Sequence, residues 1–253
     1  MKKNKKVILA FSGGLDTSFC VLWLKKKGYK VITLTVDTGG FTKTEIEQIK
    51  QQAIKVGSSK HYFLNGKQFL YEKIVSYIIK GNILRGGLYP LCAGPERLII
   101  ATKLVETAKK EHAQVVAHGA TGAGNDQVRF DVTMNVLHPK LKIIAPIREL
   151  GIKREDEIQF LKKNHIPVST ISKSYSINKG MLGTTLGGNE TKGSWESPPE
   201  DIYPGIIPIF QTSNIPVDLI LSFQKGMPTA INGKKMEGIK IIESLTEIGG
   251  KHG

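Results

Sequence analysis

The sequence predicts an α/β protein: a doubly wound parallel sheet followed by a second, incomplete α+β domain. Short apolar segments alternate with amphipathic ones over the first 168 of the 253 residues, and this rhythm stops near residue 168. Strands that alternate with helices form right-handed βαβ units, which build a parallel sheet. We therefore expect one domain at residues 1–168 and another at residues 169–253.

The elements of the first domain follow from apolar runs and helix-ending signals. Residues 6–11 are too short an apolar run for a helix and predict a buried parallel strand. A helix follows, because Lys25–Lys27 fill its last turn and Gly28 is placed to cap it. By the same reasoning we expect strands at 30–40, 60–65, 113–119 and 142–147, and helices from Thr42 or Thr44 to Gly57 and at 68–79, 95–111 and 153–166.

The second domain has a different composition. Residues 169–205 are rich in Ser, Thr, Gly and Pro, and so long an irregular segment usually has a functional reason. After it we expect paired strands with turns at Lys225–Gly226 and Asn232–Gly233, and then a closing helix that runs into glycines.

Charge alone leaves the partner open. The formal net charge of +14 favours nucleotides, RNA or a membrane surface as anionic partners. The lysine runs near residues 2–6 and 25–27 are more typical of solvated faces and helix ends. Basic residues interleaved with aromatic ones, which a single-strand RNA platform needs, are not evident.

Cysteine content and hydropathy point to the cytoplasm. Cys20 and Cys92 are the only cysteines, and their spacing matches neither a zinc site nor a disulfide scaffold. The apolar run at residues 7–11 is shorter than the roughly 7 to 15 residues of a signal-peptide core. No stretch approaches the ~20 apolar residues of a membrane span.

Two glycine-rich loops carry the chemistry. The first, AFSGGLDTS at residues 10–18, joins a strand to a helix, where backbone N–H groups and the helix N-terminus attract an anion. Ser12, Thr17 and Ser18 add hydroxyl donors, and Asp16 could cap the helix or bind magnesium. The sequence contains neither GxxxxGK[ST] nor GxGxxG. Gly-Gly alone would also fit an ordinary tight turn.

The second loop, HGATGAGNDQVRF at residues 118–130, places three glycines, an Asn-Asp pair and one Arg between apolar segments. A polar surface turn is the simplest interpretation of such a loop, with the Arg paired to a nearby carboxylate.

Both loops resemble known motifs. SGGLDTS resembles the pyrophosphatase loop of N-type ATP pyrophosphatases, and HGATGAGNDQVRF resembles the signature of the argininosuccinate synthase family. Further segments resemble that family in the same order: YPL (89–91), YSI (175–177), PPEDIY (198–203), FQKGMPTAINGKKM (223–236) and LTEIGGKHG (245–253).

The resemblance implies an adenine nucleotide alpha hydrolase-like fold and an ATP- and Mg²⁺-dependent ligase of arginine biosynthesis. Such a ligase joins citrulline to aspartate. The ureido oxygen of citrulline attacks the α-phosphorus, which gives citrullyl-AMP and pyrophosphate, and the aspartate amine then displaces AMP. The resemblance also implies a cytoplasmic homotetramer.

The resemblance further implies a role for individual residues. ATP would contact Ala10, Phe11, Ser12, Gly13, Gly14, Leu15, Asp16, Thr17, Ser18, Val36 and Gly119. Aspartate would bind Thr121, Asn125 and Asp126; citrulline would bind Tyr89, Asn125, Arg129, Ser176 and Thr185. We expect Ser12, Asp16 and Asp126 to act in catalysis and Asp16 to hold the metal. A guanidinium can bind a carboxylate bidentately, and a carboxylate can accept from an ammonium group, as these roles require.

The chain also departs from the family pattern. Gly94 stands where a citrulline-binding Ser is expected, although Arg97 keeps the Arg position that follows. Ala123 replaces a common Lys, and Asn178 replaces an acidic residue. Family chains continue beyond the position of Gly253, with residues that complete the citrulline site and with a helix that helps build the tetramer.

Three functions therefore compete. The first is an argininosuccinate synthase-like ligase, truncated or divergent. The second is an AMP-forming ligase on another ureido or carboxyl substrate, because Gly94 removes a hydroxyl group. The third is an RNA-modifying ATP pyrophosphatase or RNA-binding protein, which the charge favours but the absence of CxxC pairs and the presence of GNDQVRF do not.

Overall fold

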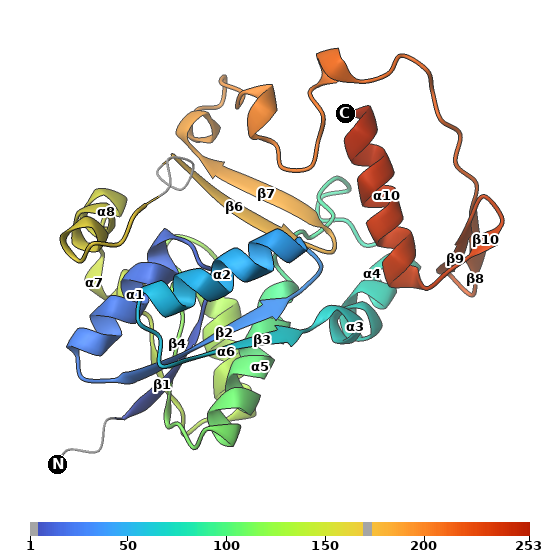
Figure 1. Ribbon diagram of the computed structural model, residues 1–253. Helices are drawn as coiled ribbons and strands as arrows, with labels where there is room; N and C mark the ends of the chain where they lie inside the picture. The colour runs from blue at the N-terminus through green and yellow to red at the C-terminus, as the bar shows by residue number, and fades with distance from the viewer. Residues whose placement is uncertain (1–4, 169–173) are drawn as a thin grey trace. The chain divides into compact units, whose positions relative to one another are not determined.

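A computed structural model describes residues 5–168 and 174–253 (Figure 1). The start of the expected irregular segment, residues 169–173, lies outside the described residues, and so do Lys2 and Lys3 of the first lysine run. The chain forms two compact units. The first holds the residues up to Asp37, Phe41–Gly66 and Glu96–Ser174, and the second holds Thr38–Gly40, Lys67–Pro95 and Tyr175–Gly253.

The first unit is built on a five-stranded parallel sheet of order β3-β2-β1-β4-β5. The strands are β1 (Lys6–Ala10), β2 (Lys30–Asp37), β3 (Lys60–Asn65), β4 (Val115–Ala117) and β5 (Lys142–Ile144). Strands β1 and β4 are apolar on both faces, as is typical of parallel sheets that helices cover on both sides, whereas β2 also buries Thr33 and Thr35. The predicted doubly wound α/β fold is confirmed.

Helices cover the two faces of this sheet. On one face, α1 (Leu15–Lys26), α2 (Lys43–Lys55), α7 (Pro146–Leu150) and α8 (Arg154–Lys163) share a core with the odd-numbered side chains of β1. On the other face, α5 (Glu96–Lys110) and α6 (Asp126–Leu137) pack against each other. Thr42 and Glu45 form a capping box that starts α2 at the first of its two expected positions.

Four expectations in the first unit are wrong in part. Residues 118–130 are not wholly a loop, because α6 begins at Asp126 and places Arg129 on a helix. The expected strand at 142–147 ends at Ile144, since Pro146 cannot donate to a strand ladder and instead opens α7. The strands expected at 30–40 and 113–119 are also shorter than predicted.

The second unit contains helices and two antiparallel sheets. The expected helix at 68–79 is formed by α3 (Lys67–Leu70), a π-helical turn η1 (Tyr71–Val75) and α4 (Ser76–Lys80). The sheet strands are β8 (Leu221–Gln224), β9 (Met227–Ile231) and β10 (Lys234–Lys235), joined by the two predicted turns. The closing helix α10 (Gly238–His252) runs through its glycines rather than ending at them.

The segment expected to be irregular contains a hairpin. Strands β6 (Tyr175–Gly180) and β7 (Gly183–Gly188) pair antiparallel, and short 3₁₀ turns follow: η2 (Asn189–Lys192), η3 (Glu200–Ile202) and η4 (Ile209–Gln211). Backbone hydrogen bonds between β6 and β7 hold this hairpin together, which the Ser-, Thr- and Gly-rich composition does not predict. Among the described residues, no helix has the length and apolarity needed to cross a membrane.

Candidate functional site

The two glycine-rich loops lie side by side at the point where the sheet order reverses. The chain runs outward from β1 through β2 to β3 and then returns to β4 on the other side of β1. The first loop leaves the carboxyl end of β1, and the second loop leaves the carboxyl end of its neighbour β4. A Cβ atom on Gly119 would lie 3.2 Å from Thr17 Cγ2 and 3.6 Å from the Asp16 carbonyl carbon. This is the crevice where doubly wound sheets bind ligands.

The first loop depends on glycine at one position. Gly13 has a φ of +78°, and a Cβ atom there would lie 3.1 Å from Ile49 on α2. Across the turn, the Ser12 hydroxyl accepts from the Gly14 N–H at 3.3 Å and lies 3.3 Å from the Thr17 hydroxyl. Gly14 is the N-cap of α1, so Asp16 is a first-turn residue and not the cap. The helix start is left open to an anion.

Behind this loop, the buried carboxyl group of Glu157 lies beside the half-buried carboxyl group of Asp16. Glu157 on α8 is 3 % exposed, and burial raises its pKa to about 8, with the nearby Asp16 carboxylate as the second cause. Burial also raises the pKa of Asp16, while the Arg154 guanidinium and the hydrogen bond with Glu157 oppose this. We interpret the pair as a protonated Glu157 that donates to the Asp16 carboxylate. Sequence reasoning missed Glu157, whose one signal is an acidic residue a helical turn before the buried Leu161.

Other predicted ATP contacts lie deeper in the unit. Ser18 is buried, and its hydroxyl accepts from Gln52 Nε2 at 3.1 Å. Val36 is buried on β2, where its backbone is in register with Leu64 of β3. The Phe11 N–H donates to the Leu34 carbonyl at 2.8 Å. Because the Ser18 and Val36 side chains are buried, any contact of these residues with ATP would be made by their backbone atoms.

The predicted aspartate residues gather where the second loop becomes α6. Thr121 and Asn125 are exposed, and neither side chain hydrogen-bonds to another residue in the described ranges. The Asp126 carboxylate accepts from Arg97 Nε and from Arg129 Nη1, each at 2.9 Å. The structure therefore brings Asp126 and Arg129 together. Arg97 joins them through its bond to Asp126, although the sequence analysis assigned no role to this residue.

The remaining predicted citrulline residues lie in the second unit. Ser176 and Thr185 share one face of the β6–β7 hairpin, since Thr185 pairs with Asn178, two residues along the same strand from Ser176. The Tyr89 hydroxyl donates to the Cys92 carbonyl. Gly94 follows Ala93, which has a φ of +60°. The residues predicted to bind citrulline thus divide between the two units.

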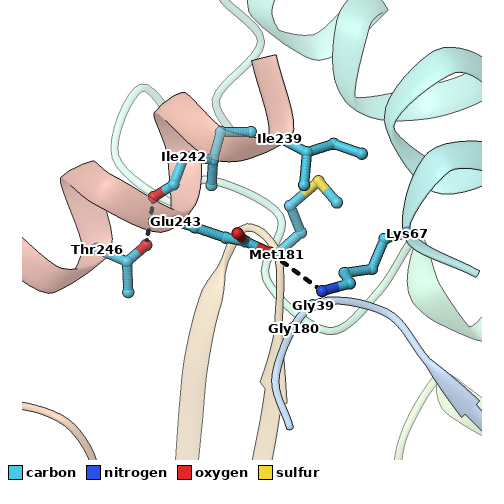
Figure 2. A pocket seen from close by; sticks show the side chains of 8 residues that line it. All are labelled: Gly39, Lys67, Gly180, Met181, Ile239, Ile242, Glu243 and Thr246. Carbon is cyan, nitrogen blue, oxygen red and sulfur yellow. Dashed lines mark hydrogen bonds and ion pairs between the residues drawn. The ribbon is translucent and has the colours of Figure 1, made fainter. Parts of the chain in front are cut away.

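A small cavity in the second unit carries none of the predicted residues. Figure 2 shows its lining: Gly39, Lys67, Gly180, Met181, Ile239, Ile242, Glu243 and Thr246. Lys67 Nζ lies 3.1 Å from Glu243 Oε1 across it. At about 150 Å³ the cavity is smaller than the roughly 300 Å³ that small-molecule pockets usually offer.

Metal ligands are sparse in this structure. The described residues contain no group of three or more His, Cys, Asp or Glu side chains placed to hold an ion. Asp16 is the one predicted ligand, and Mg²⁺ commonly takes one or two carboxylates together with substrate phosphates and water. Asp16 fits a metal whose other ligands come from a nucleotide.

Two family models together match nearly the whole chain. Residues 6–167 match the family model described as "Arginosuccinate synthase N-terminal HUP domain", and residues 175–253 match the "Arginosuccinate synthase C-terminal domain".

Curated relatives are similar along nearly the whole chain. Argininosuccinate synthase of Sulfurisphaera tokodaii is 41 % identical over 98 % of this chain and 63 % of its own length. The enzyme of Methanocaldococcus jannaschii is 42 % identical over 97 % and 62 %, and that of Bacillus pumilus is 38 % identical over 100 % and 62 %. The chain thus spans 62–63 % of these relatives. By its two matching domains, the chain belongs to the argininosuccinate synthase family.

Proposed function

We propose that the chain catalyses the ATP-dependent joining of citrulline to aspartate, with release of AMP and pyrophosphate. One observation carries the proposal: the pyrophosphatase-like loop and the GNDQVRF loop meet at the switch point of the sheet, with Gly119 against Asp16 and Thr17. A nucleotide held by the first loop would therefore present its phosphates to substrates held by the second. Names of family relatives support the same activity.

In the first step, residues 10–18 hold the triphosphate, and Val36 and Gly119 contact the nucleoside. The Ser12 and Thr17 hydroxyls bond to each other and to the backbone of the loop. When a triphosphate binds, they exchange these bonds for phosphate oxygens and stabilise the charge that develops on the departing pyrophosphate. Positioning of the citrulline oxygen against the α-phosphorus supplies the rest of the catalysis.

Asp16 holds the metal in this proposal. Mg²⁺ bound there supplies neutralisation of phosphate charge when the nucleotide is present. The protonated Glu157 keeps Asp16 oriented because its carboxyl O–H donates a hydrogen bond to the Asp16 carboxylate, in accord with the raised pKa of Glu157.

In the second step, Thr121 and Asn125 donate hydrogen bonds to aspartate while Asp126 accepts from its amine. Arg97 keeps its hold on Asp126, whereas Arg129 turns to the carboxylate of citrulline. Tyr89, Asn125, Ser176 and Thr185 complete citrulline binding. We further propose that the domains are residues 1–168 and 169–253 and that the protein acts in the cytoplasm as a homotetramer.

The test is release of labelled AMP from α-³²P-ATP by the purified chain. We expect AMP and pyrophosphate in equal amounts, dependent on both citrulline and aspartate. Exchange of labelled pyrophosphate into ATP should need citrulline but not aspartate, because the first step is complete without the amine. Absence of AMP with both amino acids present would overturn the proposal.

A second candidate rests on Gly94. Because this position lacks the hydroxyl of the family pattern, the same two-step chemistry could act on a different ureido or carboxyl compound. Replacing citrulline in the assay with other ureido and carboxyl compounds, with aspartate kept constant, distinguishes the two. AMP release with one of these but not with citrulline would favour the second candidate.

A further inference from the structure

His118 is a fully buried side chain with both ring nitrogens engaged. It follows β4, is 0 % exposed, and stacks on Phe130 with ring centroids 5.0 Å apart. Its Nδ1 lies 3.2 Å from the Ala120 N–H, which can only donate. Nδ1 is therefore the acceptor, and the proton sits on Nε2, which donates to Asp131 Oδ1 at 3.0 Å.

The hydrogen-bonded chain continues from Asp131 back to the same loop. Arg148 Nη1 on α7 donates to Asp131 Oδ2 at 2.7 Å and to Gln127 Oε1 at 2.9 Å. Gln127 Nε2 then donates to the Gly122 carbonyl at 2.8 Å. Four side chains from the end of β4, from α6 and from α7 thus form one continuous network.

The two ends of this network lie on either side of one residue. One end holds the Ala120 N–H and the other holds the Gly122 carbonyl, so the backbone before and after Thr121 is fixed. Thr121 itself is exposed, and its side chain makes no hydrogen bond within the described part of the chain. Its hydroxyl is therefore available to a ligand, while the four network side chains bond to one another and to the backbone on either side of Thr121.

We propose that His118, Asp131, Arg148 and Gln127 are positioning residues that set the affinity of the Thr121 loop for aspartate. This rests on the proposed function only for the identity of the amino acid. The pKa of His118 is lowered, first by burial and then by the Arg148 charge, while Asp131 and Glu149 act in the opposite direction. The neutral ring that the network requires is therefore favoured.

Gln127 gives the sharpest test, because it is only partly buried and ends the network. Gln127→Glu can still accept from Arg148 but cannot donate to the Gly122 carbonyl. We expect its KM for aspartate to rise about fivefold, as loss of one hydrogen bond implies, while its KM for ATP stays within about twofold. Gln51→Glu is the matched control, since Gln51 also bonds by its amide to a neighbouring side chain, but on α2.

A second measurement does not depend on turnover. Amide hydrogen exchange across residues 119–125 should be faster in Gln127→Glu than in the unchanged chain and the Gln51→Glu control. If the unchanged chain shows no aspartate-dependent turnover, the proposed function fails, while exchange still tests the network. Equal exchange in all three proteins, or an equal rise in the KM values for aspartate and ATP, would overturn the proposed positioning role of the network.

Discussion

The Asp126 carboxylate is held by the guanidinium groups of Arg97 and Arg129. Within the described part of the chain it makes no hydrogen bond or ion pair with residues 10–18. We predict that Asp126→Ala abolishes aspartate-dependent AMP release, because in the proposed site the aspartate amine loses its acceptor and Arg97 loses one hydrogen bond. ATP affinity should stay within about tenfold, since Asp126 hydrogen-bonds to Arg97 and Arg129 rather than to residues 10–18. Steady-state kinetics and calorimetric titration with ATP check the two parts separately. Equal losses in both would show that Asp126 acts through the fold or the nucleotide.

Glu157 predicts an unusual dependence of stability on pH. Its pKa is raised from 4.5 to about 8, so between these values the folded chain holds a proton that the unfolded chain releases. The contribution of Glu157 to the free energy of unfolding therefore falls as the pH rises through this window. Glu157→Gln keeps the donor to Asp16 and cannot ionise. We expect it to match the unchanged chain near pH 5 and to exceed its stability at pH 9, by on the order of 1–3 kcal/mol.

Urea unfolding at the two pH values measures this effect. Glu155→Gln is the matched control, because Glu155 is exposed on the same helix and loses the same charge. If both variants respond alike, the effect comes from overall charge and not from the buried pair.

Elements differ in how well the sequence predicts them, and α6 and the β6–β7 hairpin show why. In α6 the apolar residues from Val128 to Val136 fall at every second position, which is the period of a strand, so the sequence lacks the spacing by which a helix is recognised. The hairpin is rich in Gly, Ser and Thr, and its order comes from backbone pairing. By contrast, β1 was predictable because burial on both faces favours an unbroken apolar run, and β2 because its residues are mostly β-branched and apolar.

The candidate site divides in the same way. Its motif residues could be proposed from the sequence because they lie in two contiguous stretches, residues 10–18 and 118–130, that resemble known motifs. Glu157, Arg148 and Asp131 were not, because each meets its partners only after the chain has folded.

Helix α10 offers a prediction within one element, from two adjacent glycines. A Cβ atom on Gly249 would meet nothing within 4 Å, but one on Gly250 would lie 2.1 Å from the Gly205 carbonyl oxygen. Gly249→Ala should stabilise the protein by up to ~0.8 kcal/mol, since Ala is the better helix former. Gly250→Ala should destabilise it by about 1–3 kcal/mol, because backbone must move. Urea unfolding of the pair tests this, and equal stabilities would contradict the packing.

At the scale of the whole molecule, the net charge of +14 raises the question of RNA. A charge excess alone produces binding that depends on counterion release and carries no sequence information. Some of this charge is already paired on the surface: Glu111 accepts from Lys60 and Lys6, and hydrogen bonds from Lys60, Tyr62 and Lys6 lower the pKa of Glu111 to about 2.

This reasoning predicts how RNA will behave in the ligase assay. RNA binding should weaken by about a thousandfold or more between about 50 and about 200 mM salt, as expected for several phosphate contacts. AMP release with citrulline and aspartate should change far less, because in the proposed site backbone N–H groups in a crevice would hold the triphosphate as well as charge. Fluorescence anisotropy with a labelled RNA, beside labelled-ATP turnover at both salt concentrations, measures the two. AMP release that requires tRNA at about 200 mM salt would instead assign the nucleotide loop to RNA modification, because nonspecific binding would by then be screened.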